Sequence, residues 1–273
     1  MISFFAKEPY ILEKPSGSTR QRMSTVIRAE EIAEYIGGKV NPEQTQGTCI
    51  YLKPHSLNHI KDGDYVDVLD DLKVTNKMSS RPGINVIAMT TPHKEWLESF
   101  LPNKVFHVPH PHVNLERKVR IRKEVTTCGY VGANKPAQRY WAEKLKSRLA
   151  KENIEFIPLF NFKTREDIIK FYEGIDIQVI GNFGFLTDVP YYHEKKIVDA
   201  MSFGIPTISE RKLGYRDVED YYIKVGSVEE LIAQVKSLQE DYIRPQVLIN
   251  KAEEYHISNI AKLYERLEHT DSR

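Results

Sequence analysis

The chain has 273 residues, 41% of them hydrophobic and 28% charged, which is the composition of a folded globular protein with room for two small domains. Lys and Arg (39) nearly balance Asp and Glu (38), so the net charge of +1 gives no overall attraction to nucleic acid or anionic membranes. Cys49 and Cys128 lie far apart without partners at metal-ligand spacing, so we expect buried thiols in a reducing compartment. The first residues lack the pattern of a signal peptide, and no apolar run approaches the roughly 18 residues of a membrane span. We therefore expect a cytoplasmic protein.

The first half of the chain alternates short apolar runs with helical patterns, which predicts a parallel sheet. A glycine-bearing loop follows the first run. The expected strands are 2–5, 49–52, 65–69, 84–89 and 105–108, and the expected helices are 24–36 and 92–100.

A polar and basic stretch, 113–124, follows this half and is expected to connect two domains. The second half repeats the alternation and begins with a strand at 126–131. Ser227 and Glu230 have the spacing of a capping box at the start of a late helix. The further strands are expected at 154–159, 175–180, 205–208 and 222–225, and the helices at 136–150, 165–172, 195–203, 227–238 and 245–267.

The most informative segment is 195–209, KKIVDAMSFGIPTIS, in which apolar residues recur at helical spacing before Gly204 and Pro206 end the helix. Lys195 and Asp199 lie one turn apart at its start. A helix N-terminus with a nearby lysine favours a phosphate, and Asp199 is placed to accept hydrogen bonds from ribose hydroxyls. An amphipathic helix that leads into a buried strand explains the same pattern without a ligand.

Lys196 to Ile208, KIVDAMSFGIPTI, resembles a segment of the GT-B nucleotide-sugar glycosyltransferases, in particular the C-terminal domain of the retaining family 4-like members. The resemblance implies an α/β fold of two Rossmann-like domains facing a central cleft. It implies an acceptor domain at 1–122, a donor domain at 123–250 and a last helix at 251–273 that crosses back to the first domain. In that family the acidic residue of this helix, here Asp199, holds the donor ribose, and the helix start, here Lys195 and Lys196, holds the diphosphate.

One position departs from the family pattern. Many retaining members carry a second Glu eight residues before the acidic residue, where this chain has Tyr191. The second acidic contact is therefore missing or comes from Asp188 or Glu194.

The loop between the strand at 126–131 and the next helix carries Gly132, Asn134 and Lys135, with Pro136 suited to the first helical turn. Glycine lets a backbone approach a phosphate closely, and free amides bind it. The family resemblance places the donor diphosphate here, with Lys135 as its cation. An ordinary glycine-containing turn is the alternative.

Three further loops are candidates for binding. Phe160 and Asn161 follow the second strand of the second half, where similar enzymes hold the base, and Tyr192 ends an aromatic-rich loop suited to stacking on base or sugar. In the first half the loop 15–22 resembles the N-terminal loop of many GT-B enzymes. Its predicted acceptor- or phosphate-binding residues are Gly17, Arg20 and Arg22. A buried aromatic anchor and a solvated basic loop are the respective alternatives.

The candidate catalytic residues are Asp70, His110 and Lys195. Asp70 and Asp71 form an acidic pair at a strand end, and Asp70 is suited to positioning or to a general-base role; a helix cap is the alternative. His110 belongs to FHVPHPHVN, whose histidines lack a third metal ligand in the sequence, so no metal is expected. His93, at another helix start, is a minor candidate.

The sequence therefore predicts a glycosyltransferase, a hexosyltransferase that moves a sugar from a nucleotide-sugar donor, preferably a UDP-sugar, to an acceptor hydroxyl without an obligatory metal. The acceptor stays open among a glycan, a lipid-linked or small molecule, and a hydroxymethylated base in DNA. The DNA hypothesis depends on the cations of the connector, which are Arg117, Lys118, Arg120, Arg122 and Lys123. A nucleotide-sugar epimerase and a non-catalytic nucleotide-sugar-binding protein are two further hypotheses, and the stereochemical outcome is open.

Overall fold

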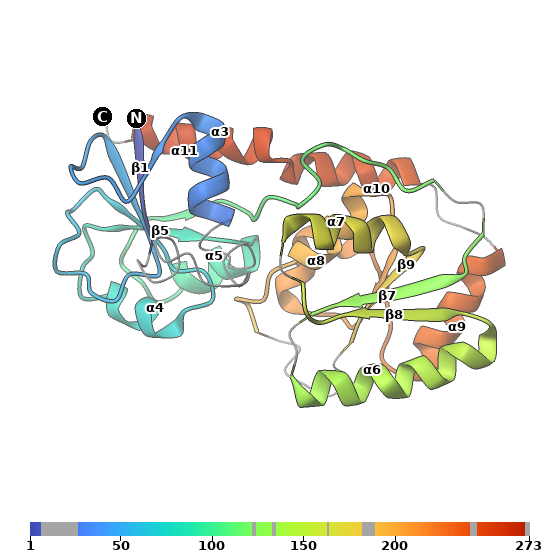
Figure 1. Ribbon diagram of the computed structural model, residues 1–273. Helices are drawn as coiled ribbons and strands as arrows, with labels where there is room; N and C mark the ends of the chain where they lie inside the picture. The colour runs from blue at the N-terminus through green and yellow to red at the C-terminus, as the bar shows by residue number, and fades with distance from the viewer. Residues whose placement is uncertain are drawn as a thin grey trace. The chain divides into compact units, whose positions relative to one another are not determined.

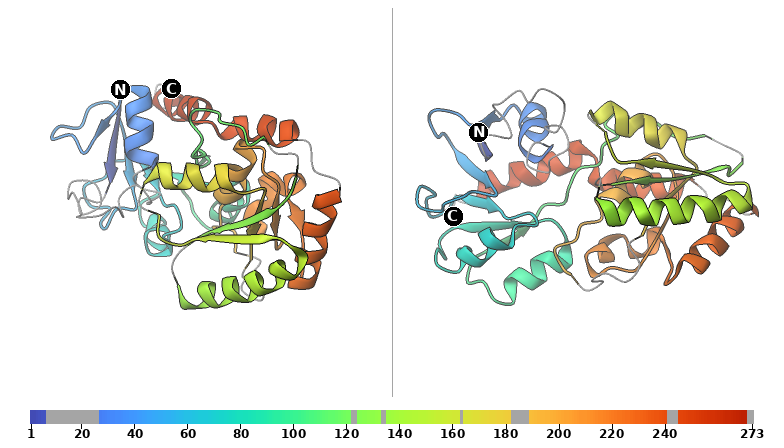
Figure 2. Two further views of the ribbon diagram at one scale, coloured as in Figure 1. Left: turned by 45° about the vertical axis from the view of Figure 1, so that its right-hand side comes forward. Right: turned by 60° about the horizontal axis from the view of Figure 1, so that its bottom comes forward.

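The computed structural model spans residues 1–273 and describes residues 1–6, 27–121, 124–132, 135–162, 164–181, 189–240 and 245–270 (Figures 1 and 2). The chain divides into two compact units. The first comprises residues 1–111, 190–193 and 255–273, and the second 112–189 and 194–254. Each unit has its own parallel sheet with helices against it, so the predicted pair of Rossmann-like α/β units is confirmed. The domain boundaries expected from the sequence stay a prediction.

The first unit contains a six-stranded parallel sheet in the order β2-β1-β3-β4-β5-β6. Its central strands are buried on both faces, which explains why they read as continuous apolar runs rather than as alternating patterns. The strands are β1 (Ile2–Ala6), β2 (Lys39–Val40), β3 (Thr48–Leu52), β4 (Tyr65–Asp67), β5 (Asn85–Ala88) and β6 (Val105–His107).

In the part of this unit that the structure describes, two pairs of helices cover the sheet. The short π-helical turn η2 (Ile27–Glu31) leads into α3 (Ile32–Ile36), and α3 packs with α11 (Ile257–Thr270). The helices α4 (Leu72–Met78) and α5 (Thr91–Glu98) contribute Val74, Met78 and Leu97 to the core under β3, β4 and β5. Helix α4 was not predicted from the sequence, because its seven residues are too few to show a helical period.

The second unit contains a five-stranded parallel sheet in the order β11-β10-β9-β7-β8. The strands are β7 (Thr127–Val131), β8 (Glu155–Leu159), β9 (Ile177–Ile180), β10 (Thr207–Ser209) and β11 (Ile223–Lys224). The helical segments are α6 (Pro136–Leu149), η3 (Ala150–Glu152), α7 (Arg165–Gly174), α8 (Lys195–Ser202), η4 (Leu213–Tyr221), α9 (Val228–Glu240) and α10 (Pro245–Ala252).

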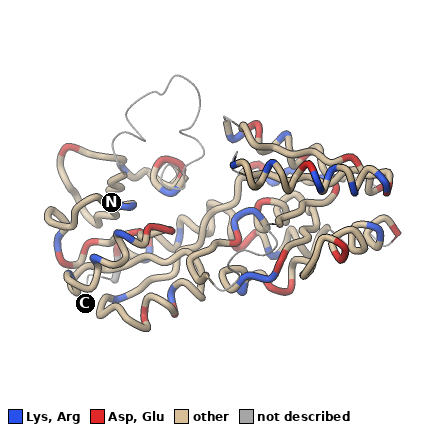
Figure 3. The backbone as a smooth tube through the Cα atoms, turned by 90° about the horizontal axis from the view of Figure 1, so that it is seen from below, with Lys and Arg blue, Asp and Glu red and all other residues tan. Residues whose placement is uncertain are grey.

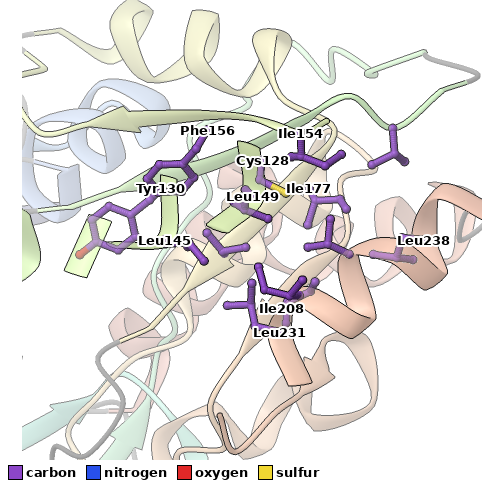
Figure 4. Close-up of a cluster of buried hydrophobic side chains, with 14 of the residues drawn as sticks. Cys128, Tyr130, Leu145, Leu149, Ile154, Phe156, Ile177, Ile208, Leu231 and Leu238 are labelled. Carbon is purple, nitrogen blue, oxygen red and sulfur yellow. The ribbon is translucent and has the colours of Figure 1, made fainter. Parts of the chain in front are cut away.

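Helices cover both faces of the second sheet (Figure 1). On one face, α6 and α9 close a core that includes Leu145, Leu149 and Leu231 (Figure 4). On the other face, α7 and α8 close a second core that includes Tyr172 and Phe203, whose rings stack with their centroids 5.2 Å apart. This arrangement gives the strands apolar partners on both sides.

The residue Gly204 ends α8 in a left-handed conformation, with φ of +77°. A Cβ atom at this position would lie 2.7 Å from Cβ of Pro245, at the start of α10. The glycine therefore provides the backbone turn and also the space that lets α10 pack on α8.

The basic stretch after residue 112 belongs to the second unit. Val113 is buried in the core with α7 and α8, although the stretch as a whole is polar and basic. Its described cations are bound to carboxylates of the same unit. The pairs are Arg117 with Glu253, Lys118 with Glu173 and Arg120 with Asp176.

The chain returns to the first unit at Tyr255. The single helix expected at 245–267 is two helices, α10 and α11, separated by the short η5 (Glu253–Tyr255). In the first unit the ring of Tyr264 packs edge-on against Phe4 at 5.5 Å, and the Tyr65 hydroxyl donates to the carbonyl oxygen of Leu267 at 3.1 Å. Among the described residues, no helix has the length and apolar character to cross a membrane.

The C-terminal helix should be essential for the stability of the first unit. Tyr264 is fully buried, so Tyr264→Ala should lower the free energy of unfolding of this unit by about 3 kcal/mol through the cavity that it leaves. Urea unfolding followed by tryptophan fluorescence measures the change. Glu265→Ala, on the exposed face of the same helix, serves as the control; equal stabilities of the two variants would contradict the assigned role.

Candidate functional site

Strand order defines a ligand edge in the second unit. There β7 lies between β8 and β9, so the chain leaves β7 toward one side of the sheet and β9 toward the other. Doubly wound sheets bind ligands outside the carboxyl ends of the strands at such a point. The loops that follow β7 and β9 therefore border the candidate site, as do the residues at the start of α8.

The predicted pair at the start of α8 is turned toward the protein. The Lys195 ammonium lies 2.9 Å and 3.2 Å from the two carboxylate oxygens of Asp199. The same carboxylate accepts a hydrogen bond of 2.8 Å from the backbone amide of Val113. These contacts hold residues 112–121 against α8. The proposed roles of Lys195 toward a diphosphate and of Asp199 toward a ribose stay predictions.

The neighbouring Lys196 has a different environment. Lys196 is a half-buried residue, and its ammonium lies over the ring of Tyr130, 5.4 Å from the ring centroid. Burial and the charge of Lys212 lower the pKa of Lys196 to about 8, against the opposing effect of Asp199. Within the described residues no carboxylate forms an ion pair with this ammonium. A desolvated cation without a counterion beside a helix N-terminus attracts an anion.

The residue Tyr130 organises this edge of the sheet. It is buried, which raises the pKa of its hydroxyl to about 12. Its ring packs against the rings of Trp141 on α6 and Phe160 after β8, with centroid distances of 5.2 Å and 5.7 Å. A Cβ atom at Gly132 would lie 2.4 Å from the Tyr130 hydroxyl oxygen, so packing requires the glycine.

Part of the loop after β7 forms hydrogen bonds within the fold. The Gly132 amide donates to the carbonyl oxygen of Leu159 at 3.1 Å and is therefore occupied. Lys135 stands at the N-terminal end of α6 with an exposed side chain, and no carboxylate of the described residues pairs with it. Gly132, Phe160 and Lys196 thus meet around Tyr130. Tyr130 and Lys212 were not predicted as site residues, since in the sequence Tyr130 is a residue of a strand and Lys212 only a charge after β10.

The two residues of the acidic pair in the first unit, Asp70 and Asp71, have different partners. Asp71 caps α4 through the amides of Lys73 and Val74, at 2.9 Å and 3.2 Å. Asp70 forms an ion pair with Lys53. Burial raises the pKa of Asp70, but the hydrogen bond and charge of Lys53 outweigh it and the pKa is lowered. A carboxylate of lowered pKa is a weak general base at neutral pH.

The residue His93, at the start of α5, is buried in a defined tautomer. Its Nδ1 accepts a hydrogen bond of 3.4 Å from the amide of Met89, so the proton of the neutral ring lies on Nε2. Burial lowers the pKa of His93 to about 4, so the ring is neutral at physiological pH. No described residue accepts from Nε2, which is itself buried.

The predicted residue His110 is buried in the first unit, where its ring lies 5.4 Å from that of His193. Tyr192 belongs to the same unit and contacts Tyr191, which in turn contacts Trp96. Among the described residues, no group of three or more His, Cys, Asp and Glu side chains is arranged to hold a metal ion.

A buried ion pair underlies the carboxyl edge of the first sheet. Arg28 and Asp67 are fully buried, with Nε and Oδ2 2.5 Å apart. The guanidinium also donates to the carbonyl oxygens of Val108 and Pro109 and lies over the ring of Tyr264. No sequence pattern indicated this pair, because Arg28 occupies the apolar face of its helical turn.

Several predicted residues lie outside the described residues. They are Gly17, Arg20, Arg22, Arg122, Lys123, Asn134 and Asp188. Asn161 is described and exposed after β8. Its role toward the base stays a prediction.

The fold of the chain is that of the GT-B glycosyltransferases. No family model matches the sequence, and no curated protein gives a significant match. The chain is similar to AviGT4, a glycosyltransferase involved in avilamycin A biosynthesis, with 8% identity, coverage of 98% of this chain and 97% of that one, and a TM-score of 0.64. It is also similar to Anabaena HepE in complex with UDP and glucose, with 13% identity, coverage of 97% and 98%, and a TM-score of 0.57.

Larger proteins share this fold as well. S. aureus TarM matches with 14% identity, 81% of this chain and a TM-score of 0.57. The chain spans only 52% to 57% of the length of TarM and the other first structures that it matches. At these identities the likeness establishes the fold.

The lowered pKa of Lys196 has a consequence for stability. A lysine whose pKa falls on folding costs free energy while it is charged, and the cost fades as the pH rises from the folded pKa of about 8 toward the ordinary value of 10.5. Lys196→Met should therefore raise the free energy of unfolding at pH 7, by about 1–2 kcal/mol, and the gain should shrink toward alkaline pH. Urea unfolding at several pH values measures it.

The matched control is Lys170→Met on α7, an exposed lysine. It should leave the free energy of unfolding unchanged at every pH. A gain for Lys196→Met that stayed constant with pH would mean improved packing rather than relief of a buried charge.

Proposed function

We propose that the chain is a glycosyltransferase that transfers a hexose from a UDP-sugar to an acceptor hydroxyl. The observation that carries the proposal is the Lys196 ammonium, which lies without a described counterion at the ligand edge of the second sheet. The GT-B fold supports it, since AviGT4 is named as a glycosyltransferase and HepE was solved with UDP and glucose.

The donor site would be built around Tyr130. Lys196 binds the diphosphate, with Lys135 and Lys195 assigned to the same group, and Asp199 is assigned to the ribose. As the bond from the sugar to the diphosphate breaks, negative charge grows on the leaving oxygen, and preplaced cations stabilise it. The lysines thus provide the positive charge that stabilises the leaving diphosphate. Phe160 and Asn161 are assigned to the base and sugar, and Gly132 and Asn134 to the loop that shapes the site. The role of Tyr192, which belongs to the first unit, stays a prediction.

The first unit would supply the acceptor side. Gly17, Arg20 and Arg22 are assigned to an anion on donor or acceptor, and His110 to the substrate. Asp70 is held ionised by Lys53, which favours a positioning role over that of a base. This arrangement favours the retaining, family 4-like mechanism, in which the departing phosphate rather than a protein carboxylate takes the acceptor proton.

A glycan or a small molecule is the proposed acceptor. The DNA hypothesis depended on the connector, whose described cations Arg117, Lys118 and Arg120 are bound by carboxylates of the second unit. Paired cations contribute little to phosphate binding. The buried thiols of Cys49 and Cys128 fit the reducing cytoplasm that we propose as the site of action.

The donor proposal is tested by thermal shift with UDP-, GDP-, ADP- and TDP-linked sugars. At concentrations well above Kd the bound donor should raise Tm by on the order of 5 °C. Lys196→Ala should abolish the shift because it removes the cation that meets the diphosphate, whereas Lys170→Ala should keep it. No shift with any nucleotide sugar, or an undiminished shift in Lys196→Ala, would contradict the donor site.

The assignment of roles is tested by turnover, measured as release of the nucleoside diphosphate. Lys196→Ala should lower kcat by about a hundredfold, since one electrostatic contact to a leaving group contributes on this scale. Asp70→Asn should lower kcat less than tenfold, because a positioning residue tolerates loss of charge. A loss of about a thousandfold or more in Asp70→Asn would instead identify Asp70 as a general base. Binding without any turnover would favour a non-catalytic protein.

A further inference from the structure

The helix α6 carries an excess of cations on its solvent-facing surface. Its buried residues are Ala142, Leu145 and Leu149, Trp141 packs partly buried against the same core, and the positions on the opposite side face solvent. Figure 3, seen from below so that α6 faces the viewer, shows Lys and Arg recurring along it. The exposed cations of α6 and its two flanks are Lys135, Arg139, Lys144, Lys146, Arg148 and Lys151.

Most of these charges are uncompensated within the described residues. Arg148 forms an ion pair with Glu229 of α9, and Glu152 is bound by Lys236. The other five cations have no carboxylate partner there, and the acidic residue among them is Glu143. The surface therefore concentrates positive charge in a protein whose net charge is only +1.

The spacing arranges the five cations in two rows. One row contains Lys135, Arg139 and Lys146, at intervals of four and seven residues along one side of the helix. The other row contains Lys144 and Lys151, seven residues apart along a second side. Tyr140 lies between the rows and is 65% exposed, with the Lys144 ammonium 4.4 Å from its ring centroid. The 14 residues of α6 give this surface a length of about 21 Å.

We propose that this cationic face of α6 binds the anionic headgroups of a lipid bilayer. Lysine and arginine near an anionic leaflet are attracted to it, and tyrosine is favoured at the headgroup level, where its ring and its hydroxyl meet different surroundings. The proposal concerns where the protein docks and does not depend on the proposed sugar transfer.

The packing of α6 favours a flat partner over a nucleic acid. Helix α9 lies in the same layer against the same core and is joined to α6 by the Arg148–Glu229 pair (Figure 1). A major groove about 12 Å wide admits a single helix, whereas a planar surface meets the whole outer face of this layer.

Co-sedimentation with lipid vesicles tests the proposal. The whole chain should bind vesicles of phosphatidylcholine with about a third phosphatidylserine, and should bind pure phosphatidylcholine vesicles much more weakly. Binding should fall as salt rises, because the attraction is electrostatic. The test variant neutralises four cations outside the proposed donor site and carries Arg139→Gln, Lys144→Gln, Lys146→Gln and Lys151→Gln.

This variant should lose at least about tenfold in partitioning, at unchanged Tm and unchanged response to the nucleotide sugar. A matched control removes the same charge from exposed lysines of the first unit, with Lys39→Gln, Lys61→Gln, Lys73→Gln and Lys104→Gln. It should keep its partitioning within about twofold.

Three results would overturn the proposal. They are equal binding to neutral and anionic vesicles, an equal loss in both variants, and a preference for duplex DNA over anionic vesicles at the same salt that disappears in the α6 variant. The last result would assign the face to nucleic acid. None of these measurements requires turnover, so failure here is separate from failure of the proposed transferase activity.

Discussion

One constraint governs both units: every strand of a parallel sheet delivers its following loop to the same edge. In the second unit the central position of β7 separates the loops after β7 and β9, and the start of α8 comes to lie beside them. Lys196 meets Tyr130 there for topological reasons, although the two residues lie far apart in the sequence. The electrostatics of the site therefore follow from strand order more than from any local motif.

The sequence predicted the segments whose ends are marked by glycine or proline. The helix–strand unit at 195–209 is bounded by Gly204 and Pro206, and the structure has α8 and β10 there. The prediction failed where a segment is too short for a period, as in α4, or where a break has no strong signal, as between α10 and α11. At that break the residues 253–256 include no glycine or proline, and the helices on its two sides pack in two different units.

Side-chain partners were harder to predict than elements. Lys195 and Asp199 have a spacing that fits a ligand site and also fits an intrahelical ion pair, and the fold uses the pair to anchor Val113. Gly132 has a similar ambiguity. Its small size suggested a phosphate loop, while the structure shows the Tyr130 hydroxyl filling the space that a side chain would need. The contacts that decide such cases, with Val113 in one and the Tyr130 ring in the other, come from tertiary packing, which a local pattern does not encode.

Burial distinguishes Lys196 from the exposed lysines of α6 in the second unit. Burial makes a lysine costly unless something compensates it, so a fold keeps one such as Lys196 when a bound anion or a nearby ring offsets the cost. The exposed cations of α6 carry no such cost, since water solvates them, and their effect is collective and sensitive to salt. A net charge of +1 hides both features. A single desolvated charge therefore needs a specific partner, whereas a row of solvated charges acts together as an extended surface.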